Sequence, residues 1–362
     1  MTLDAVASPE YTTSSSMPLI SVIMPAYNVE RFIAQAVQSV IDQSYWNWEL
    51  IVVDDASTDG TPRVMGGFSD PRIRFFSIQK IGSPAGVRNV GLKMAKGELI
   101  AFLDGDDLYY PETLERLLRP LLENSRLGAV YGFPSSMDEN GKPLPPTVIL
   151  IPQPATETSP ASYIVPESVV HTWENIITSR TNCQLPSLMI RKQFLDGVGI
   201  FNEELSGVED YEFYMRLYLY DYDGIACLGD YVYQYRIHTQ SLTKSPEHCR
   251  HLLNSCLIIL EWLFTEAPLP SEVKPYRSLA YASSYRYLAR ERLLNGQHDL
   301  CRELLWKAIR DPHILPSDLY QQCFTLLLRS FLPTYLNDFL VMCKRNLRAW
   351  MGSRQMHLAS ES

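Results

Sequence analysis

The sequence has 362 residues, of which 46% are hydrophobic and 20% are charged, and its net charge at pH 7 is −9. This composition is that of a globular protein long enough to form one large domain or two smaller ones. The negative charge argues against a general nucleic-acid binder, because no positive field would attract a phosphate backbone. Acidic residues outnumber basic ones in residues 1–244 and the balance reverses from 245 onward, which predicts a domain boundary near residue 245.

The cysteines and the lack of long apolar runs indicate a reducing, aqueous environment. The seven cysteines are odd in number and show no CxxC spacing, so neither a disulfide framework nor a zinc site is predicted. Residues 1–18 lack the basic start and apolar core of a signal peptide, and we expect a disordered lead-in. No run approaches the ~20 apolar residues that cross a bilayer. We therefore expect a cytoplasmic protein, either free or peripheral on the inner face of the membrane.

Residues 19–103 alternate between continuous apolar runs and segments with apolar residues at helical spacing. Continuous apolar strands are typical of a parallel sheet that helices bury on both faces. We expect Pro25 to end the first strand. The predicted fold class is α/β, with a mainly parallel, Rossmann-like sheet followed by an all-α region. The predicted strands span residues 19–24, 48–53, 72–78 and 99–103, and the predicted helices span 30–43 and 84–96.

Polar clusters follow three of these strands, at residues 25–28, 54–59 and 104–107. In such sheets ligands bind outside the carboxyl ends of the strands. The last cluster holds three carboxylates around Gly105, and a buried strand that ends in carboxylates needs a cation or hydrogen bonds. Oxygen ligands of this kind suit Mg²⁺ or Mn²⁺ shared with substrate phosphates, although a solvated Asp-rich turn is the alternative. Neither GxGxxG nor GxxxxGK[ST] occurs where a dinucleotide site or P-loop would need it.

Residues 22–61 and 86–114 resemble the N-terminal half of a family 2 glycosyltransferase with the GT-A fold. Residues 198–217 resemble the acceptor-side segment of that family, and residues 231–243 resemble the strand that closes the catalytic domain. The resemblance ends near residue 244. It implies a catalytic domain at 19–244, with a nucleotide-sugar half at 19–133 and an acceptor half at 134–244. The lead-in at 1–18 and the helical region at 245–362 are predicted from composition and helical periodicity.

The resemblance implies a donor site for a nucleoside-diphosphate sugar. Asp55 would accept a hydrogen bond from the base, typically uracil. Asp106 would lie nearest a Mn²⁺ or Mg²⁺ ion, with Asp104 nearer the ribose or sugar and His238 as a further ligand or a plain strand-end histidine; Asp107 would be structural. The implied donor-site residues are Pro25, Ala26, Tyr27, Asn28, Glu30, Asp54, Asp55, Ser57, Arg88, Asn89, Asp104, Gly105 and Asp106.

The implied reaction is inverting transfer of a sugar to a hydroxyl of a glycan or lipid-linked acceptor, as in polysaccharide biosynthesis of the cell envelope. A bound metal would neutralise the diphosphate leaving group, and the resemblance makes Asp210 the base that activates the hydroxyl, with Glu209 beside it. The alternative for Glu209 and Asp210 is a pair of acids favoured by a helix N-terminus. Arg88 could instead pair with a surface carboxylate.

Residues 133–168 are irregular and rich in Pro, Ser and Thr, and we expect a long loop that faces the acceptor. From residue 246 onward the pattern is helical. Residues 334–354 form a basic amphipathic segment that could lie on an anionic membrane or pack on the preceding helices. No pattern indicates an oligomeric state. The predicted C-terminal helices span residues 248–266, 271–295, 300–310, 316–329 and 334–351.

Two other functions compete with the transferase. A sugar-1-phosphate nucleotidyltransferase should have a Gly-rich basic loop after the first strand, and residues 25–30 contain neither glycine nor lysine. A non-catalytic module that binds sugar nucleotides or glycans should lack the base or the Asp-x-Asp pair, and both are present. A processive synthase is disfavoured because no QxxRW-type motif and no membrane-spanning run occur.

Overall fold

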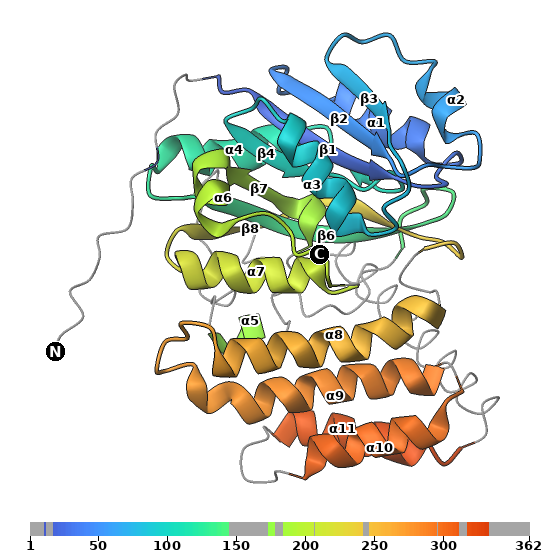
Figure 1. The fold of residues 1–362 in the computed structure, drawn as a ribbon, viewed down its shortest axis with the longest axis vertical. Helices are drawn as coiled ribbons and strands as arrows, with labels where there is room; N and C mark the ends of the chain where they lie inside the picture. The colour runs from blue at the N-terminus through green and yellow to red at the C-terminus, as the bar shows by residue number, and fades with distance from the viewer. Residues whose placement is uncertain are drawn as a thin grey trace, which may run out of the picture. The chain divides into compact units, whose positions relative to one another are not determined.

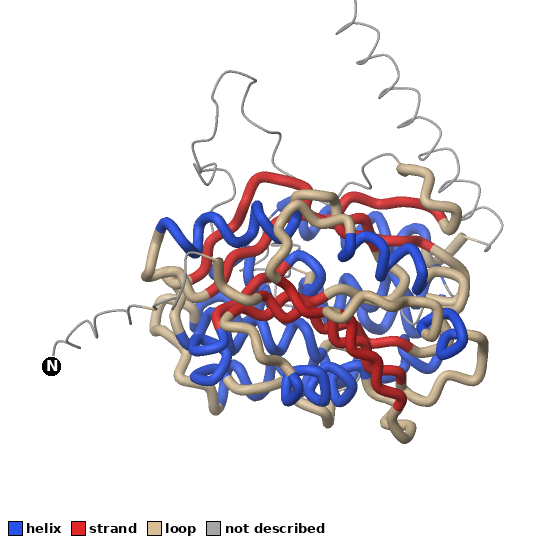
Figure 2. Tube along the Cα trace, turned by 90° about the horizontal axis from the view of Figure 1, so that it is seen from above, coloured by secondary structure: helices blue, strands red, loops and turns tan. Residues whose placement is uncertain are grey.

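The computed structural model describes residues 11, 17–144, 173–177, 184–205, 207–241, 246–294, 296–310 and 317–332. The chain divides into two compact units, Met1–Ser255 and Cys256–Ser362. Figure 1 shows the sheet of the first unit and the helices of the second. Figure 2 distinguishes the strands of the first unit from the helices that cover them.

Within the described residues the first unit holds one eight-stranded sheet in the order β3-β2-β1-β4-β7-β6-β8-β5. The first four strands in this order are parallel to one another, whereas β7 is antiparallel to both neighbours and β5 is antiparallel to β8. The sheet is therefore mixed, with a parallel N-terminal half as expected. The strands are β1 Ile20–Ala26, β2 Trp48–Asp54, β3 Ile73–Ser77, β4 Leu99–Phe102, β5 Leu108–Tyr109, β6 Ala129–Asp138, β7 Leu188–Arg191 and β8 Ile225–Ile237.

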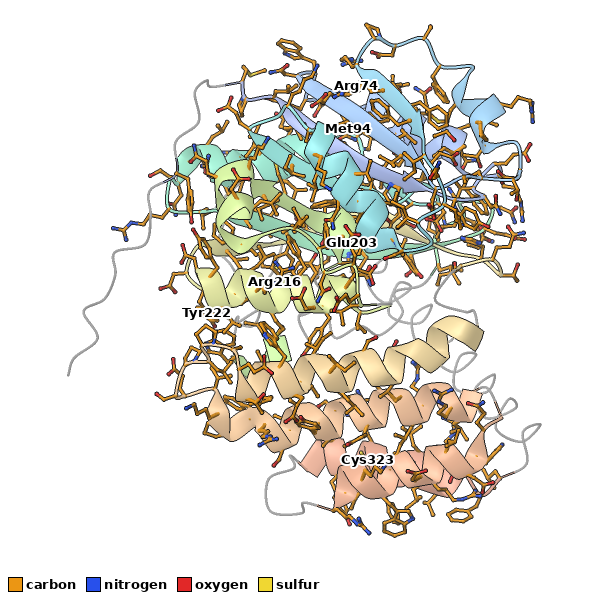
Figure 3. The ribbon with its side chains drawn as sticks, in the orientation of Figure 1. Arg74, Met94, Glu203, Arg216, Tyr222 and Cys323 are labelled. Atoms are coloured by element: carbon orange, nitrogen blue, oxygen red, sulfur yellow. The ribbon has the colours of Figure 1, made fainter. Side chains whose placement is uncertain are left out.

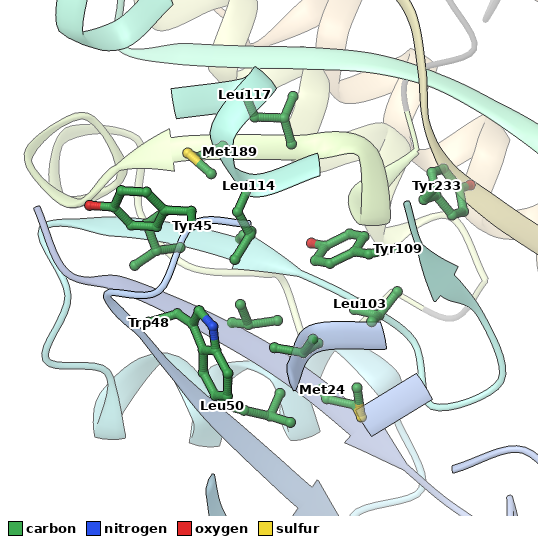
Figure 4. Close-up of a cluster of buried hydrophobic side chains, with 14 of the residues drawn as sticks. Met24, Tyr45, Trp48, Leu50, Leu103, Tyr109, Leu114, Leu117, Met189 and Tyr233 are labelled. Atoms are coloured by element: carbon green, nitrogen blue, oxygen red, sulfur yellow. The ribbon is translucent and has the colours of Figure 1, made fainter. Parts of the chain in front are cut away.

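Helices cover both faces of this sheet. One face packs on α1 and α4 through a cluster of buried side chains that includes Leu50, Leu114 and Leu117 (Figure 4). The other face packs on α3 so closely that a Cβ atom at Gly91 would lie 2.5 Å from Ile23 Cγ2. The helices of this unit are α1 Ile33–Ile41, α2 Thr61–Met65, α3 Pro84–Met94, α4 Thr113–Glu123, α5 Trp173–Ile177, the 3₁₀ turn η1 Leu185–Ser187, α6 Lys192–Val198 and α7 Glu209–Tyr220.

The prediction that Pro25 ends the first strand is wrong. Pro25 lies inside β1 and pairs with Val53 of β2, and the ladder continues to Ala26. The pairing between β1 and β4 stops at Ile23 and Phe102, so Pro25 lies where β4 has already ended. A strand tolerates proline at a position where its missing N–H is not needed by a neighbour.

Strand pairing also decides two further boundaries. Residues 133–138, which we expected to be irregular, belong to β6 because they pair in parallel with β8. Helix α4 begins only at Thr113, because Leu108 and Tyr109 form β5 against β8. In both places pairing with a strand about a hundred positions away overrides the local pattern. Residues 145–168 lie outside the described part of the chain.

The described residues of the second unit are mainly helical, as predicted, although residues 271–273, predicted to open a helix, form a turn. No helix among the described residues is long and apolar enough to cross a membrane. The predicted segment at 334–354 lies outside the described residues. The helices are α8 Pro246–Thr265, which begins in the first unit, the 3₁₀ turn η3 Lys274–Tyr276, α9 Arg277–Leu294, α10 His298–Ile309 and α11 Ser317–Arg329.

Candidate active site

Three loops leave the same edge of the sheet, because β1, β2 and β4 are parallel neighbours. The backbone N–H of Asp55 donates to the Ala26 carbonyl at 2.9 Å, which ties the first two loops together. In the third loop, a Cβ atom at Gly105 would lie 3.2 Å from the Pro25 carbonyl oxygen and 3.1 Å from Ile33 Cδ1. This close approach favours glycine. The structure thus brings together the three polar clusters at the strand ends.

The loops after β1 and β2 are joined through Asn28 and Ser57. Asn28 has a φ of 53°, a left-handed conformation that asparagine tolerates better than most residues. Its backbone N–H donates to Ser57 Oγ at 2.9 Å, and its Oδ1 accepts from the Thr58 N–H at 2.8 Å. Buried Asp54 accepts from the Ser57 N–H at 3.3 Å and from the Ser77 hydroxyl at 2.9 Å. These contacts give Asn28, Asp54 and Ser57 a role in shaping the loops.

Glu30 and Asp59 join the same two loops a few residues further on. The Glu30 N–H donates to Asp59 Oδ2 at 3.0 Å, and Glu30 Oε2 accepts from the Gly60 N–H at 2.8 Å. Arg63 pairs with Glu30 at 2.8 Å. Burial would raise the pKa of Asp59, but hydrogen bonds from Thr61 and from the Glu30 N–H outweigh it and lower that pKa. Glu30 is therefore held by the loop after β2.

Asp55 forms one wall of a corner that also contains Tyr27 and Lys80. Its carboxylate is buried and accepts from the N–H groups of Ile81 at 2.5 Å and Gly82 at 2.9 Å. Lys80 Nζ lies 3.5 Å from Asp55 Oδ2 and 2.9 Å from the centroid of the Tyr27 ring, as in a cation–π contact. Tyr27 is 47% exposed, so its ring is available to a flat ligand. A carboxylate has about four acceptor positions, so Asp55 can accept a further hydrogen bond.

Arg88, from α3, bridges the loop after β4 to the start of α7. Its Nη2 lies 2.7 Å from Asp104 Oδ1 and its Nη1 lies 3.2 Å from Glu209 Oε1. Arg88 and Glu209 are buried, so the alternative for Arg88, a surface ion pair, does not hold. Burial raises the pKa of Asp104, and the Arg88 charge opposes this rise. We call this arrangement, Asp104–Arg88–Glu209, the arginine bridge.

Asp106 meets His238 from the end of β8. His238 Nε2 lies 2.9 Å from Asp106 Oδ2, and its buried ring packs 4.6 Å from the ring of Phe32. Arg236 Nε donates to the Asp106 carbonyl at 2.7 Å, and the Arg236 backbone N–H donates to Asp107 Oδ1 at 2.8 Å. Asp107 thus anchors β8 to the loop at residues 104–107, which we call the acidic loop, and this geometry supports the structural role expected for Asp107.

Asp210 lies in the first turn of α7, next to Glu209. Burial raises its pKa to about 6, and the neighbouring Glu209 charge adds to the rise. The Tyr211 N–H donates to Asp210 Oδ1 at 2.7 Å and opposes it. A carboxyl group with such a pKa can accept and release a proton near neutral pH, as a general base must.

Asn89, expected in the donor site beside Arg88, makes its contacts with a different loop. It is 1% exposed, and its amide bonds to the backbone of Phe201 and to Glu203. The sequence analysis did not single out Phe201, Glu203 or Arg236. Arg236 could have been noticed as a cation two residues before His238, whereas the role of Phe201 depends on contacts more than a hundred positions away.

The comparisons with known proteins agree with this architecture. Residues 21–184 match the sequence model of the family described as "Glycosyl transferase family 2". The chain is 43% identical over 114 residues to the Escherichia coli UDP-Glc:alpha-D-GlcNAc-diphosphoundecaprenol beta-1,3-glucosyltransferase WfgD, covering 32% of this chain and 45% of that protein. It is 40% identical over 129 residues to the putative teichuronic acid biosynthesis glycosyltransferase TuaG of Bacillus subtilis, covering 35% and 51%. The chain thus spans about half the length of the curated relatives that it matches.

Two solved structures share the fold. Residues 1–349 of S. aureus TarS in complex with UDP-GlcNAc align with a TM-score of 0.59 and 21% identity, covering 86% of this chain and 89% of that one. Mannosyltransferase PcManGT from Pyrobaculum calidifontis in complex with GDP-Man and Mn²⁺ aligns with a TM-score of 0.53 and 16% identity, covering 87% and 86%. At these identities the likeness shows the fold alone, an α/β sheet of the GT-A type.

Proposed function

We propose that this chain, in which residues 21–184 match glycosyl transferase family 2, moves a sugar from a nucleoside-diphosphate sugar to a hydroxyl group of a glycan or lipid-linked acceptor. The observation that carries the proposal is the convergence at one sheet edge of an aromatic and carboxylate corner, an acidic loop and a carboxylate with a raised pKa. We assign the aromatic and carboxylate corner to the nucleobase, the acidic loop to the diphosphate, and the carboxylate with the raised pKa to the acceptor hydroxyl.

We assign the nucleobase to the corner formed by Asp55, Tyr27 and Lys80. The exposed Tyr27 ring offers a stacking surface, and Asp55 retains acceptor capacity for a ring N–H of the base. Uracil carries such an N–H between two carbonyl groups. A UDP-linked donor is further supported by the UDP-Glc named for WfgD and the UDP-GlcNAc bound to TarS.

The acidic loop fits a divalent cation that is shared with the donor. Asp106 and His238 come from distant parts of the chain to within 2.9 Å, and His238 Nδ1 is buried without a hydrogen-bond partner. The described residues contain no group of three or more His, Cys, Asp or Glu side chains arranged for a metal. Two protein ligands leave positions for diphosphate oxygens, which is typical of Mg²⁺ and Mn²⁺ bound with a nucleotide. When bound, the metal would neutralise charge on the leaving diphosphate.

Asp104 is a less suitable ligand than Asp106, because the guanidinium of Arg88 already pairs with it. We therefore assign the metal to Asp106 and His238 and place Asp104 on the donor sugar or ribose. Its pairing with Arg88 reduces the repulsion between Asp104 and an anionic donor. The acidic loop as a whole can then accept a donor that carries its own negative charge.

Asp210 acts as the base in the proposed reaction. Its ionised carboxylate takes the proton of the acceptor hydroxyl while that oxygen attacks the sugar carbon and the bond to the diphosphate breaks. With one base on the face opposite the leaving group, the transfer is a single displacement with inversion at the anomeric carbon. Glu209 stays paired with Arg88 and holds the first turn of α7 in place.

A lipid-linked acceptor is supported by the diphosphoundecaprenol substrate named for WfgD. Such an acceptor would bring the protein to the inner face of the membrane, where the basic amphipathic segment at residues 334–354 could bind. The same relatives support a role in cell-envelope polysaccharide biosynthesis, since one is named for teichuronic acid biosynthesis and the other for a diphosphoundecaprenol substrate. The membrane contact does not depend on the donor chemistry. It is tested by liposome flotation of the protein with and without residues 334–362. Equal partitioning of the two proteins would exclude this segment as the anchor.

The test of the function is a panel of nucleotide sugars. We expect one UDP-linked sugar with Mn²⁺ to raise the melting temperature selectively, because a ligand that binds only the folded state stabilises it by mass action. The selected donor is then incubated with acceptors, and release of nucleoside diphosphate is measured. Selective binding without transfer in a broad acceptor panel would favour a non-catalytic module. Release of pyrophosphate from a nucleoside triphosphate and a sugar phosphate would favour a nucleotidyltransferase.

A further inference from the structure

Asn89 holds the segment that leads into α7 by a two-sided contact with one backbone residue. Its Oδ1 accepts from the Phe201 N–H at 3.0 Å, and its Nδ2 donates to the Phe201 carbonyl at 2.9 Å. The same Nδ2 group donates to Glu203 Oε1 at 2.8 Å. Three of the four hydrogen-bonding positions of the amide are thus used by residues 201–203. Asn89 is 1% exposed, so it has almost no surface left to contact a nucleotide-sugar donor.

The side chain of Phe201 packs between the strand before the acidic loop and the helix that carries the base. Its ring lies edge-on to Phe102 of β4 at 5.6 Å between centroids and 4.4 Å from Phe213 of α7. Phe102 precedes Asp104 by two positions, and Phe213 follows Asp210 by three. A ring fixed between these two residues therefore limits how far α7 can move relative to the acidic loop.

Glu203 extends the contact along the same face of α3. A Cβ atom at Gly86, in the first turn of α3, would lie 3.4 Å from Glu203 Oε2, so this carboxylate lies against that turn. Figure 3 shows Glu203 between α3 and α7. A negative charge is favourable at the N-terminal end of a helix. The segment 201–203 is thus attached to α3 through both backbone and side-chain groups.

We propose that Asn89 and Phe201 form a positioning unit that sets the spacing between the acidic loop and Asp210. The inference rests on the proposed function and refines it, because it moves Asn89 from the donor site to the support of the base. Asn89 acts through Phe201 and touches neither substrate. The arginine bridge also joins α3 to the start of α7, since Arg88, the residue before Asn89, pairs with Glu209.

The test compares Asn89→Ala and Phe201→Leu with Lys93→Ala, an exposed position on the same helix. Three quantities are measured: hydrogen exchange of residues 199–208 in the protein alone, affinity for UDP with Mn²⁺, and the kcat and donor KM of transfer. We expect exchange in this loop to become about tenfold faster or more in Asn89→Ala, because two backbone hydrogen bonds are lost. We expect kcat to fall by about 10²-fold, since a small misplacement of a base has effects of that size. UDP affinity and donor KM should stay within about threefold of the wild type.

Each of the three measurements can contradict the proposal independently. If UDP affinity falls tenfold or more in Asn89→Ala while loop exchange is unchanged, Asn89 belongs to the donor site and the inference is overturned. If loop exchange increases but kcat is retained, the unit does not position the base. If the wild type transfers no sugar, the proposed function fails, and unchanged loop exchange in the two variants would then separately reject the contact role. Phe201→Leu keeps the test informative should Asn89→Ala not fold.

Discussion

Replacing Arg88 by methionine removes the only cation that contacts both Asp104 and Glu209 among the described residues. Methionine keeps an unbranched apolar side chain of similar length but has no charge and no donor. The variant leaves Glu209, whose side chain is 9% exposed, without its counter-ion, and leaves Asp104, at 32%, partly hydrated. The perturbation therefore isolates the contribution of a buried charge that is shared between two carboxylates.

The expected loss of unfolding free energy is about 3 kcal/mol. Removing one partner of a buried ion pair typically costs about 3–5 kcal/mol, because the other charge remains buried and uncompensated. We take the low end of that range because Asp104 is hydrated enough for water to screen part of its charge. The matched control is Arg116→Met. Arg116 also bridges two carboxylates, Glu112 at 2.7 Å and Asp230 at 3.8 Å, but all three side chains are at least 43% exposed. We expect less than about 1 kcal/mol for the control.

The pH dependence of the loss has a definite sign. In the wild type, burial raises the pKa of Asp104 while Arg88 holds it down. Without Arg88 the folded-state pKa rises further above its unfolded value, so the ionised carboxylate destabilises the folded protein most at high pH. Protonation removes this penalty as the pH falls. The difference between Arg88→Met and wild type should therefore be larger at pH 8 than at pH 5.

Urea unfolding at both pH values measures this difference. Because the chain has two compact units, the transition should be followed by hydrogen exchange of β1 and β4, which reports on Met1–Ser255 alone. A loss that is equal at pH 5 and pH 8, or no greater than that of Arg116→Met, would refute the idea that the arginine bridge offsets buried negative charge.

Three other changes test the acidic loop and the base. Asp106→Asn should abolish metal-dependent turnover, because a neutral amide cannot replace the carboxylate charge. It should also weaken Mn²⁺ binding, measured by electron paramagnetic resonance with UDP present. Full turnover of the variant in metal-free buffer would contradict the assignment. Asp210→Asn should retain UDP affinity and lose transfer. In the wild type, kcat/KM should decrease as the pH drops below about 6, where Asp210 takes up a proton. A decrease that begins only near pH 4 would exclude Asp210 as the base. Gly105→Ala should destabilise the protein by about 1–3 kcal/mol in urea, because its Cβ would meet Pro25 and Ile33 at 3.1–3.2 Å, and a loss below about 0.5 kcal/mol would show that the loop adapts.

Local patterns in the sequence were sufficient for the parallel half of the sheet. Continuous apolar runs marked β1, β2 and β4, because a strand buried on both faces has no polar side to interrupt it. The placement of three polar clusters at one edge followed from the parallel order alone. The boundaries failed where a distant strand decided them, as at Pro25 and at residues 133–138.

What the sequence by itself determined was therefore the class of the domain and the identity of its polar clusters. The tertiary structure decided which of those residues contact each other. Arg88 and Glu209 are 121 positions apart, and Asp106 and His238 are 132 apart, so no local period relates them. Asn89 illustrates the difference: its motif predicted a donor contact, but its buried amide bonds to Phe201, 112 positions away. Side-chain hydrogen bonds have a range of about 3 Å, so only the folded chain decides which partner lies within it.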